Sequence, residues 1–269
     1  MSEISELPHS SRRIPLALKL ALTAFVCVQV PFYWSAYGPT NFLYFCDVAL
    51  FLTLASVWTE RRLPASMAAL GILLPQLLWV LDFMGGLFGH PFVGMTAYMF
   101  QDGQPLYARA ISLFHGWLPF LLVYLVYRLG YDRRALGAWT LLAWGLMLIA
   151  YFFLPAPPAP VDQPNLPVNV DYVYGMSDDK PQEWMPPLAW LGVMMVGLPI
   201  LFFIPTHLSL DWLMGPDGIL RQYRPGVIGV VESPQLWETS AGLVPKPSEA
   251  IVDSRPRLDD LFTLETPRE

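Results

Sequence analysis

The sequence predicts an all-α fold, a polytopic membrane bundle of about six transmembrane helices with both termini in the cytoplasm and a largely disordered cytoplasmic tail. Hydrophobic residues make up 54% of the 269 residues and charged residues only 14%, whereas about 25% of a typical soluble domain is charged. Long segments almost free of charge alternate with short connectors, and lysine and arginine gather in every second connector. These three features favour a chain that crosses a bilayer several times.

Six segments are long and apolar enough to cross a membrane. Each helical residue adds about 1.5 Å, so about 20 mainly apolar residues cover a hydrocarbon core about 30 Å thick. The predicted spans are residues 14–34, 41–58, 65–85, 107–127, 136–154 and 188–205. Residues 1–13 are then a cytoplasmic N-terminus, and residues 207–269 are a cytoplasmic tail.

Basic residues orient the bundle, since lysine and arginine favour the cytoplasmic side. Those next to the first span, between spans two and three, and between spans four and five are Arg12, Arg13, Lys19, Arg61, Arg62, Arg128, Arg133 and Arg134. The opposite connectors hold only Arg109 and Lys180 of the sixteen basic residues. This alternation supports six spans and places both termini inside.

Two outer connectors are long, at residues 86–106 and 155–187. Glycines and prolines interrupt the first, which predicts an interfacial or re-entrant stretch rather than a span. The second begins with many prolines and is predicted to run as extended chain, and Tyr172 and Tyr174 favour a cover over the outer helix ends. The tail is too polar to form a core, and residues 208–269 are a candidate site for a protein partner.

Ionisable residues within the spans are few, so each is a candidate for function. Asp47 lies in span two, about 10 Å below the outer surface, and His115 in span four lies at nearly the same depth. A lone carboxylate in hydrocarbon costs at least about 2.5–3.5 kcal/mol. Asp47 therefore needs a partner, a proton or water, and His115 is the nearest candidate partner by depth.

Two rows of polar residues complete the layer, because residues at i, i+3 and i+6 share one side of a helix. The rows are Gln76, Trp79 and Asp82 in span three, and Arg109, Ser112 and His115 in span four. Arg109 and Asp82 lie closer to the surface and are expected to form a second pair. The polar groups of spans two to four are thus predicted to converge in the outer leaflet.

Three hypotheses fit this layer. In the first, a membrane-embedded enzyme uses Asp47 to orient His115, which acts as acid or base on a lipid-like substrate. In the second, the layer is a pocket that binds or carries a lipid or an apolar small molecule, lined by Asn41, Gln76, Trp79, Asp82, Arg109 and Ser112. In the third, the polar groups only join helices by hydrogen bonds, and the protein is an accessory or scaffold subunit of a membrane complex.

The sequence identifies no cofactor. It contains four histidines and no HxxxH or HExxH spacing, so no metal-ligand set is predicted. It also lacks a basic patch interleaved with aromatic residues, which disfavours nucleic acid as a partner.

Two stretches carry a resemblance. Residues 38–58 (GPTNFLYFCDVALFLTLASVW) and 111–136 (ISLFHGWLPFLLVYLVYRLGYDRRAL) are similar to those of a group of bacterial multi-pass proteins that are described only as membrane or membrane-associated proteins. Asp47 and His115 lie within them. The resemblance implies a bacterial cytoplasmic (inner) membrane and brings no activity, substrate or cofactor.

Overall fold

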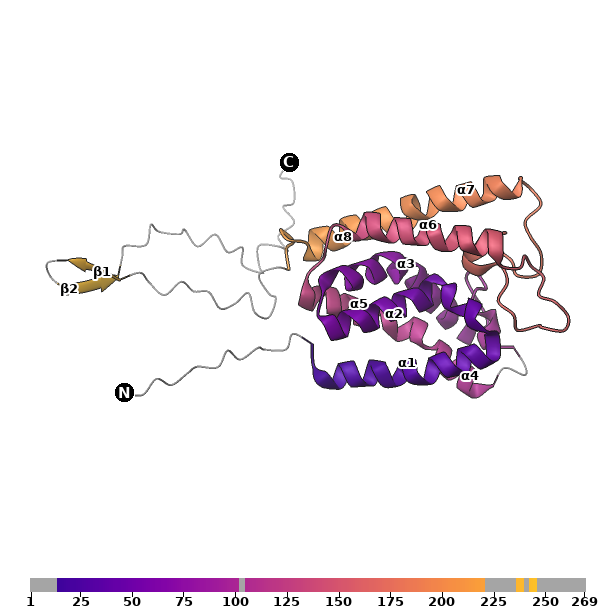
Figure 1. Cartoon of the computed structure of the whole chain (residues 1–269), viewed down its shortest axis with the longest axis horizontal. Coiled ribbons are helices and arrows are strands. Elements are labelled where there is room, and N and C mark those ends of the chain that lie inside the picture. Colours follow the sequence, from indigo (N-terminus) through magenta and orange to yellow (C-terminus); the bar gives the residue numbers. More distant parts are fainter. Residues whose placement is uncertain (1–13, 102–104, 221–235, 240–241, 246–269) are drawn as a thin grey trace, which may run out of the picture. The chain divides into compact units, whose positions relative to one another are not determined.

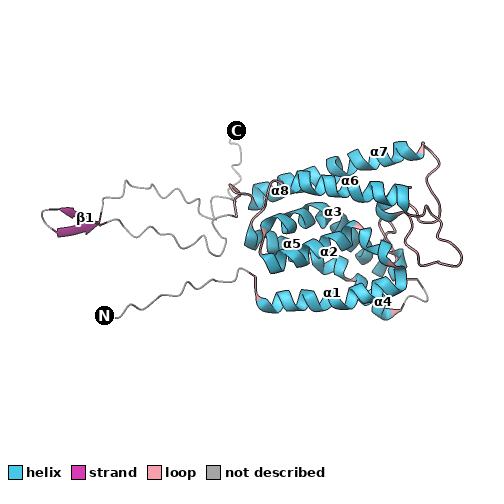
Figure 2. Ribbon diagram, in the orientation of Figure 1, coloured by secondary structure: helices cyan, strands magenta, loops and turns pink. Residues whose placement is uncertain are grey.

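Helices form the membrane part of the protein. The computed structural model describes residues 14–101, 105–220, 236–239 and 242–245. Within these residues, five helices are long and apolar enough to cross a membrane (Figures 1 and 2). They are α1 (Leu16–Tyr37), α3 (Arg62–Leu87), α4 (Leu106–Ser112) continued by α5 (Phe114–Leu129), α6 (Ala135–Phe153), and the segment Pro187–Met214. The chain is therefore a multi-pass membrane protein with a helical bundle, as the composition predicts.

The span predicted at residues 41–58 is two elements. A 3-10 turn, η1 (Pro39–Leu43), precedes the 15-residue helix α2 (Phe45–Thr59). Helix α1 stops before Gly38 because Gly38 takes a φ of 82° and a proline follows it. At 1.5 Å per residue α2 is about 22 Å long, shorter than a hydrocarbon core of about 30 Å. It is apolar and packs along α3.

Successive membrane segments run in opposite directions, so their connectors gather at two ends of the bundle (Figure 1). One end, called here the short-loop end, carries connectors 60–61 and 130–134. The other, the long-loop end, carries connectors 38–44, 88–105 and 154–186.

Ion pairs gather at the short-loop end, within connector 130–134 and between the connectors and neighbouring helices. The nitrogen–oxygen distances are 2.7 Å in Lys19–Glu60, 2.8 Å in Arg134–Asp132 and 2.7 Å in Arg133–Asp211. The hydrogen bond from Arg134 lowers the pKa of Asp132 below its ordinary value. Basic connectors that the sequence places on one side therefore do meet at one end of the bundle.

Helix α3 packs against α2, α5 and α6. Its buried residues include Ala65, Ala68, Ala69 and Gly71. A Cβ on Gly71 would overlap the indole of Trp139 from α6, so the absence of a side chain is what lets that ring pack against α3. Small residues at a helix interface permit this close approach in membrane proteins.

The last membrane segment is longer than predicted. It comprises α7 (Pro187–Leu198), a π-helical turn η4 (Pro199–Phe203) and α8 (Ile204–Met214). The π-helical turn begins at Pro199, and Pro205 follows soon after it; each proline lacks a backbone N–H donor. The predicted tail boundary at residue 207 falls inside α8, where His207 Nδ1 lies 2.7 Å from the hydroxyl of Tyr131 and ties the helix to the short-loop end.

The two long connectors of the long-loop end are loops in their described residues, 88–101, 105 and 154–186. Residues 88–105 contain the 3-10 turn η2 (Ala97–Met99), and residues 154–186 contain the 3-10 turn η3 (Val170–Tyr172).

A β-hairpin belongs to a separate unit of the chain that begins at Gly226. Its strands are β1 (Leu236–Thr239) and β2 (Gly242–Pro245), which pair antiparallel with Leu236 opposite Pro245. The disorder predicted for residues 221–235, 240–241 and 246–269 falls on residues outside the described ones, as does the N-terminal segment 1–13.

Candidate functional site

The predicted polar layer divides into two clusters at the long-loop end. The first, the carboxamide cluster, is Gln29, Asn41 and Asp47. Gln29 Nε2 donates to Asp47 Oδ1 at 2.7 Å, and Asn41 Nδ2 donates to Asp47 Oδ2 at 3.2 Å. All three side chains are buried, and Asp47 is only 2% exposed. Two amide donors therefore stabilise a carboxylate that would be costly alone in hydrocarbon.

The start of α2 places Asp47 in this cluster. Asp47 lies in the first turn of α2, where unpaired backbone N–H groups and the helix dipole favour a negative charge. Asn41 is held in η1 just before the helix, and Gln29 comes from α1. Sequence reasoning missed Gln29 because it searched α1 for charged groups, although an amide within an apolar helix itself indicates an interhelical hydrogen bond.

The hydrogen bond expected between Asp47 and His115 does not form within the described part of the chain. His115 Nδ1 lies 2.8 Å from the backbone oxygen of Ser112, and the ring nitrogen must donate because a carbonyl oxygen only accepts. Depth along a helix does not fix the direction in which a side chain points. The amides of Gln29 and Asn41 donate hydrogen bonds to Asp47 instead.

Residues 154–186 cover the first turn of α2. Asp171 Oδ1 accepts from the backbone N–H of Phe45 at 3.0 Å and so caps α2 from a distant part of the chain. The hydroxyl of Tyr44 donates to the backbone oxygen of Val168 at 3.4 Å. Sequence reasoning missed Asp171 because its role depends on a contact across more than 120 residues.

Aromatic side chains fix the same loop to α6 and α7. The hydroxyl of Tyr174 donates to the backbone oxygen of Tyr151 at 2.6 Å, and the two rings stack with centroids 5.1 Å apart. The indole of Trp190 donates to the backbone oxygen of Tyr172 at 2.8 Å. The cover that Tyr172 and Tyr174 predict is therefore present.

The second cluster surrounds Asp82, which is fully buried. Its Oδ1 accepts from the backbone N–H groups of Val93 and Gly94 at 2.6 and 2.9 Å, and its Oδ2 accepts from the N–H and hydroxyl of Thr96 at 2.8 and 2.7 Å. Gly94 has a φ of 86°, which glycine adopts readily. This group of four residues, the Asp82 clamp, fixes the 88–105 loop on the end of α3.

The predicted pair of Asp82 with Arg109 is wrong for the described residues. Arg109 Nη2 donates to the backbone oxygen of Gln101 at 2.7 Å, while four donors from the loop occupy Asp82. Backbone N–H groups only 11–14 residues after Asp82 hydrogen-bond its carboxylate at little entropic cost. A long arginine side chain would lose more conformational entropy in doing so.

Four stacked rings connect this loop to the interior. His115 stacks on Trp79 with centroids 5.2 Å apart, Trp79 on Phe83 at 5.2 Å, and Phe83 on Phe100 at 5.5 Å. Their interplanar angles are 20°, 10° and 22°. This aromatic stack brings the predicted residues Trp79 and His115 together and ends at Phe100, which sequence reasoning missed.

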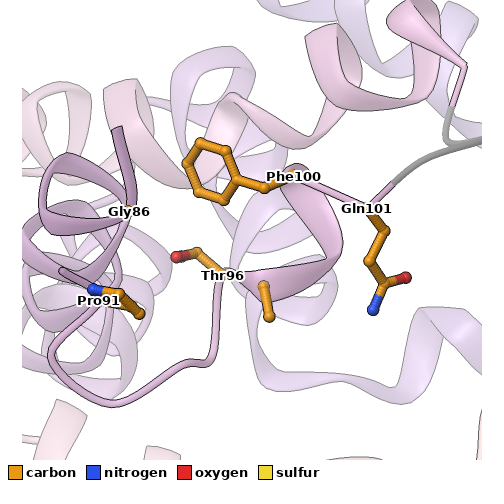
Figure 3. Close-up of a pocket in the computed structure, with 6 residues that line it drawn as sticks. Gly86, Pro91, Thr96, Phe100 and Gln101 are labelled. Carbon is orange, nitrogen blue, oxygen red and sulfur yellow. The ribbon is translucent and has the colours of Figure 1, made fainter. Parts of the chain in front are cut away.

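A shallow pocket of about 280 Å³ opens where the stack ends (Figure 3). Its lining is mostly apolar and comprises Gly86, Pro91, Thr96, Ala97, Phe100 and Gln101. The ring of Phe100 lies towards Gly86 (Figure 3), and a Cβ on Gly86 would overlap that ring. The Asp82 clamp holds Thr96, so one wall of the pocket is fixed in place.

Two other predicted residues lie away from the pocket lining. Gln76 is buried on α3, and both polar atoms of its amide have no hydrogen-bond partner within the described chain. The hydroxyl of Ser112 lies 3.5 Å from that of Tyr33 on α1. After Gln29, Tyr33 is thus a second residue of α1 that contacts a predicted polar residue and that the sequence did not indicate.

The described residues contain no group of three or more His, Cys, Asp or Glu side chains that could hold a metal ion. No protein-family model, curated protein or solved structure matches the chain. The two clusters can offer an apolar surface at the pocket and a set of buried, hydrogen-bonded carboxylates beside it.

Proposed function

We propose that the protein binds the acyl chain of a lipid-like amphiphile at the long-loop end of the bundle. The observation that carries this proposal is the apolar pocket between the end of α3 and residues 91–101. Its volume of about 280 Å³ lies just below the range of roughly 300–1,000 Å³ typical of sites for whole drug-sized molecules. The pocket therefore suits one chain of a larger molecule.

The surroundings of the pocket favour entry from the bilayer. Large apolar side chains close to its lining residues in the chain are exposed, including Phe88 at 76% and Phe92 at 73%. In a membrane protein such side chains lie in lipid or at its surface, because exposing an apolar patch of this kind to water is energetically unfavourable. An acyl chain can pass from this surface into the pocket without crossing water.

Recognition in the pocket is mainly apolar. The hydroxyl of Thr96 is already bonded to Asp82, and only Gln101 adds a polar side chain to the lining. Catalysis by Asp47 with His115 is less favoured by the geometry, because each residue is hydrogen-bonded elsewhere. Binding needs only the pocket and its fixed wall.

Photolabelling in nanodiscs tests this proposal. The full-length protein is reconstituted with a phospholipid that carries a diazirine on its acyl chain, irradiated, and mapped by mass spectrometry. We expect the label to concentrate on residues 84–101. Gly86→Ala should reduce that labelling several-fold, because the new Cβ overlaps the Phe100 ring that lines the pocket and forces it to move.

Gly145→Ala is the matched control, since a Cβ at this glycine of α6 meets no atom within 4 Å. It should label as the unchanged protein does. Labelling spread evenly over all lipid-exposed helices, and unaltered in Gly86→Ala, would exclude an acyl-chain site here.

We further propose that the bilayer is a bacterial cytoplasmic membrane with the short-loop end inside. The ion-paired basic connectors at that end support this orientation. A membrane-impermeant thiol reagent applied to intact cells should label Lys180→Cys and not Arg134→Cys, each made in a variant whose Cys27 and Cys46 are replaced. The reverse labelling pattern would refute the orientation.

A further inference from the structure

Asp171 combines an unusual backbone with an incompletely bonded carboxyl group. Its φ is 58°, and Asn169 and Tyr172 beside it also have left-handed backbones, with φ of 51° and 61°. The Asp171 side chain is only 6% exposed. One oxygen, Oδ1, accepts from Phe45, while Oδ2 has no partner among the described residues.

The groups that face Asp171 are acidic or neutral. From the α2 side they are Asp47, Cys46 and Tyr44, and from its own turn Tyr172. Asp178 of the same loop faces Tyr44 and Tyr172 as well. Within the described chain, no lysine, arginine or histidine forms an ion pair with Asp171.

A charge on Asp171 is therefore compensated only in part, by the Phe45 N–H and the N-terminal end of α2. Burial raises its pKa well above the ordinary value, the hydrogen bond from Phe45 lowers it in part, and the nearby Asp47 raises it further. Asp47 has two amide donors to stabilise a negative charge. Of the two acids, Asp171 is the better site for a proton, because its Oδ2 has no hydrogen-bond partner among the described residues.

We propose that residues 154–186 form a proton-dependent cover over the carboxamide cluster. With Asp171 protonated the loop rests on the first turn of α2. Loss of that proton leaves two negative charges facing each other in a buried site and releases the contacts of Asp171 with Phe45 and of Val168 with Tyr44. The outer aqueous phase then gains access to Asp47.

The sign of the pH effect follows from the raised pKa. In the released loop Asp171 is in water and titrates near its ordinary pKa of about 3.9. Docking is fully stabilised below that pH and weakens as pH rises towards the raised pKa of the docked state. Within this window the docking equilibrium constant falls by up to about tenfold per pH unit.

Hydrogen–deuterium exchange of the full-length protein in nanodiscs tests the proposal. Exchange is followed between pH 5 and pH 9 in peptides covering residues 168–176, with labelling times scaled for the intrinsic pH dependence of exchange. Protection in the wild type should fall at least tenfold as pH rises. Residues 92–98, held by Asp82, serve as an internal reference whose protection should change much less.

Asp171→Asn is the decisive variant, because asparagine resembles the neutral acid and tolerates a left-handed backbone. It should keep the loop protected across the whole pH range. Asp179→Asn removes an exposed charge from the same loop and should behave as the wild type.

Asp47→Asn gives a second test that does not change the loop. Removing the facing charge should reduce the total loss of protection between pH 5 and pH 9. The proposal is overturned if wild-type protection of residues 168–176 does not depend on pH, or if Asp171→Asn shows the same dependence as the wild type. Labelling of the acyl-chain pocket is a separate measurement, so neither result here decides the acyl-chain proposal.

Discussion

At each of the two long loops of this protein an aspartate joins the loop to a helix, but in opposite ways. For residues 88–105 the helix supplies the carboxylate and the loop supplies the donors, so that Asp82 accepts four hydrogen bonds. For residues 154–186 the loop supplies the carboxylate and the helix supplies one donor, so that Asp171 accepts a single bond.

This difference decides which loop can respond to its surroundings. Both oxygens of Asp82 are bonded, and the loop that bonds them forms the wall of the pocket. One oxygen of Asp171 has no partner in the described structure, and Asp47 faces it. A fully satisfied buried carboxylate fixes a structure, whereas a partly satisfied one makes it sensitive to protonation.

Loss of the Asp82 carboxylate should have the largest effect. Asp82→Ala leaves three backbone N–H groups and one hydroxyl without their acceptor, and we expect a loss of about 3 kcal/mol in the stability of the 88–105 loop. Exchange of residues 92–98 measures it, and thermal unfolding in detergent shows whether the bundle survives. Protection equal to that of the wild type would mean that the clamp does not hold the loop.

A smaller effect is expected when Asn169, which hydrogen-bonds several backbone groups of residues 154–186, is replaced. Asn169 donates to the backbone oxygens of Gly175 and Ser177 and accepts from the N–H of Tyr174. Asn169→Ala removes these bonds and places alanine in a left-handed backbone, at a cost of about 2 kcal/mol. Exchange should rise in residues 168–176 and not in residues 92–98. An increase in both loops would show that the two are coupled.

The smallest effect is expected when a single hydrogen bond of the Asp82 clamp is removed. Thr96→Val keeps the shape and the backbone N–H but removes the hydroxyl donor to Asp82 at 2.7 Å. We expect a loss of about 1 kcal/mol, measured by exchange at residues 92–98, with Thr59→Val on the exposed end of α2 as the control. A loss as large as that of Asp82→Ala would assign the whole clamp to this hydroxyl.

The sequence indicated residues that take part in these buried arrangements, but not the partners that they meet there. Asp47 and Asp82 lie in the two clusters, and Trp79 and His115 lie in the aromatic stack, because an ionisable or aromatic residue is conspicuous in an apolar span. The pairs Asp47 with His115 and Asp82 with Arg109 did not form. Spacing along a helix gives depth and side, but the choice among several nearby partners depends on packing.

Hydropathy and the distribution of lysine and arginine by themselves determined the class of the protein and the positions of most helices, because lipid excludes charge and requires about 20 apolar residues per crossing. The tertiary structure decided which groups form hydrogen bonds with each buried carboxylate. Gln29 reaches Asp47 from another helix, the backbone of residues 93–96 folds around Asp82, and Asp171 arrives at α2 from more than 120 residues away. Hydrogen bonds are satisfied by whichever donors packing brings within 3 Å or so, and no local pattern in the sequence records that proximity.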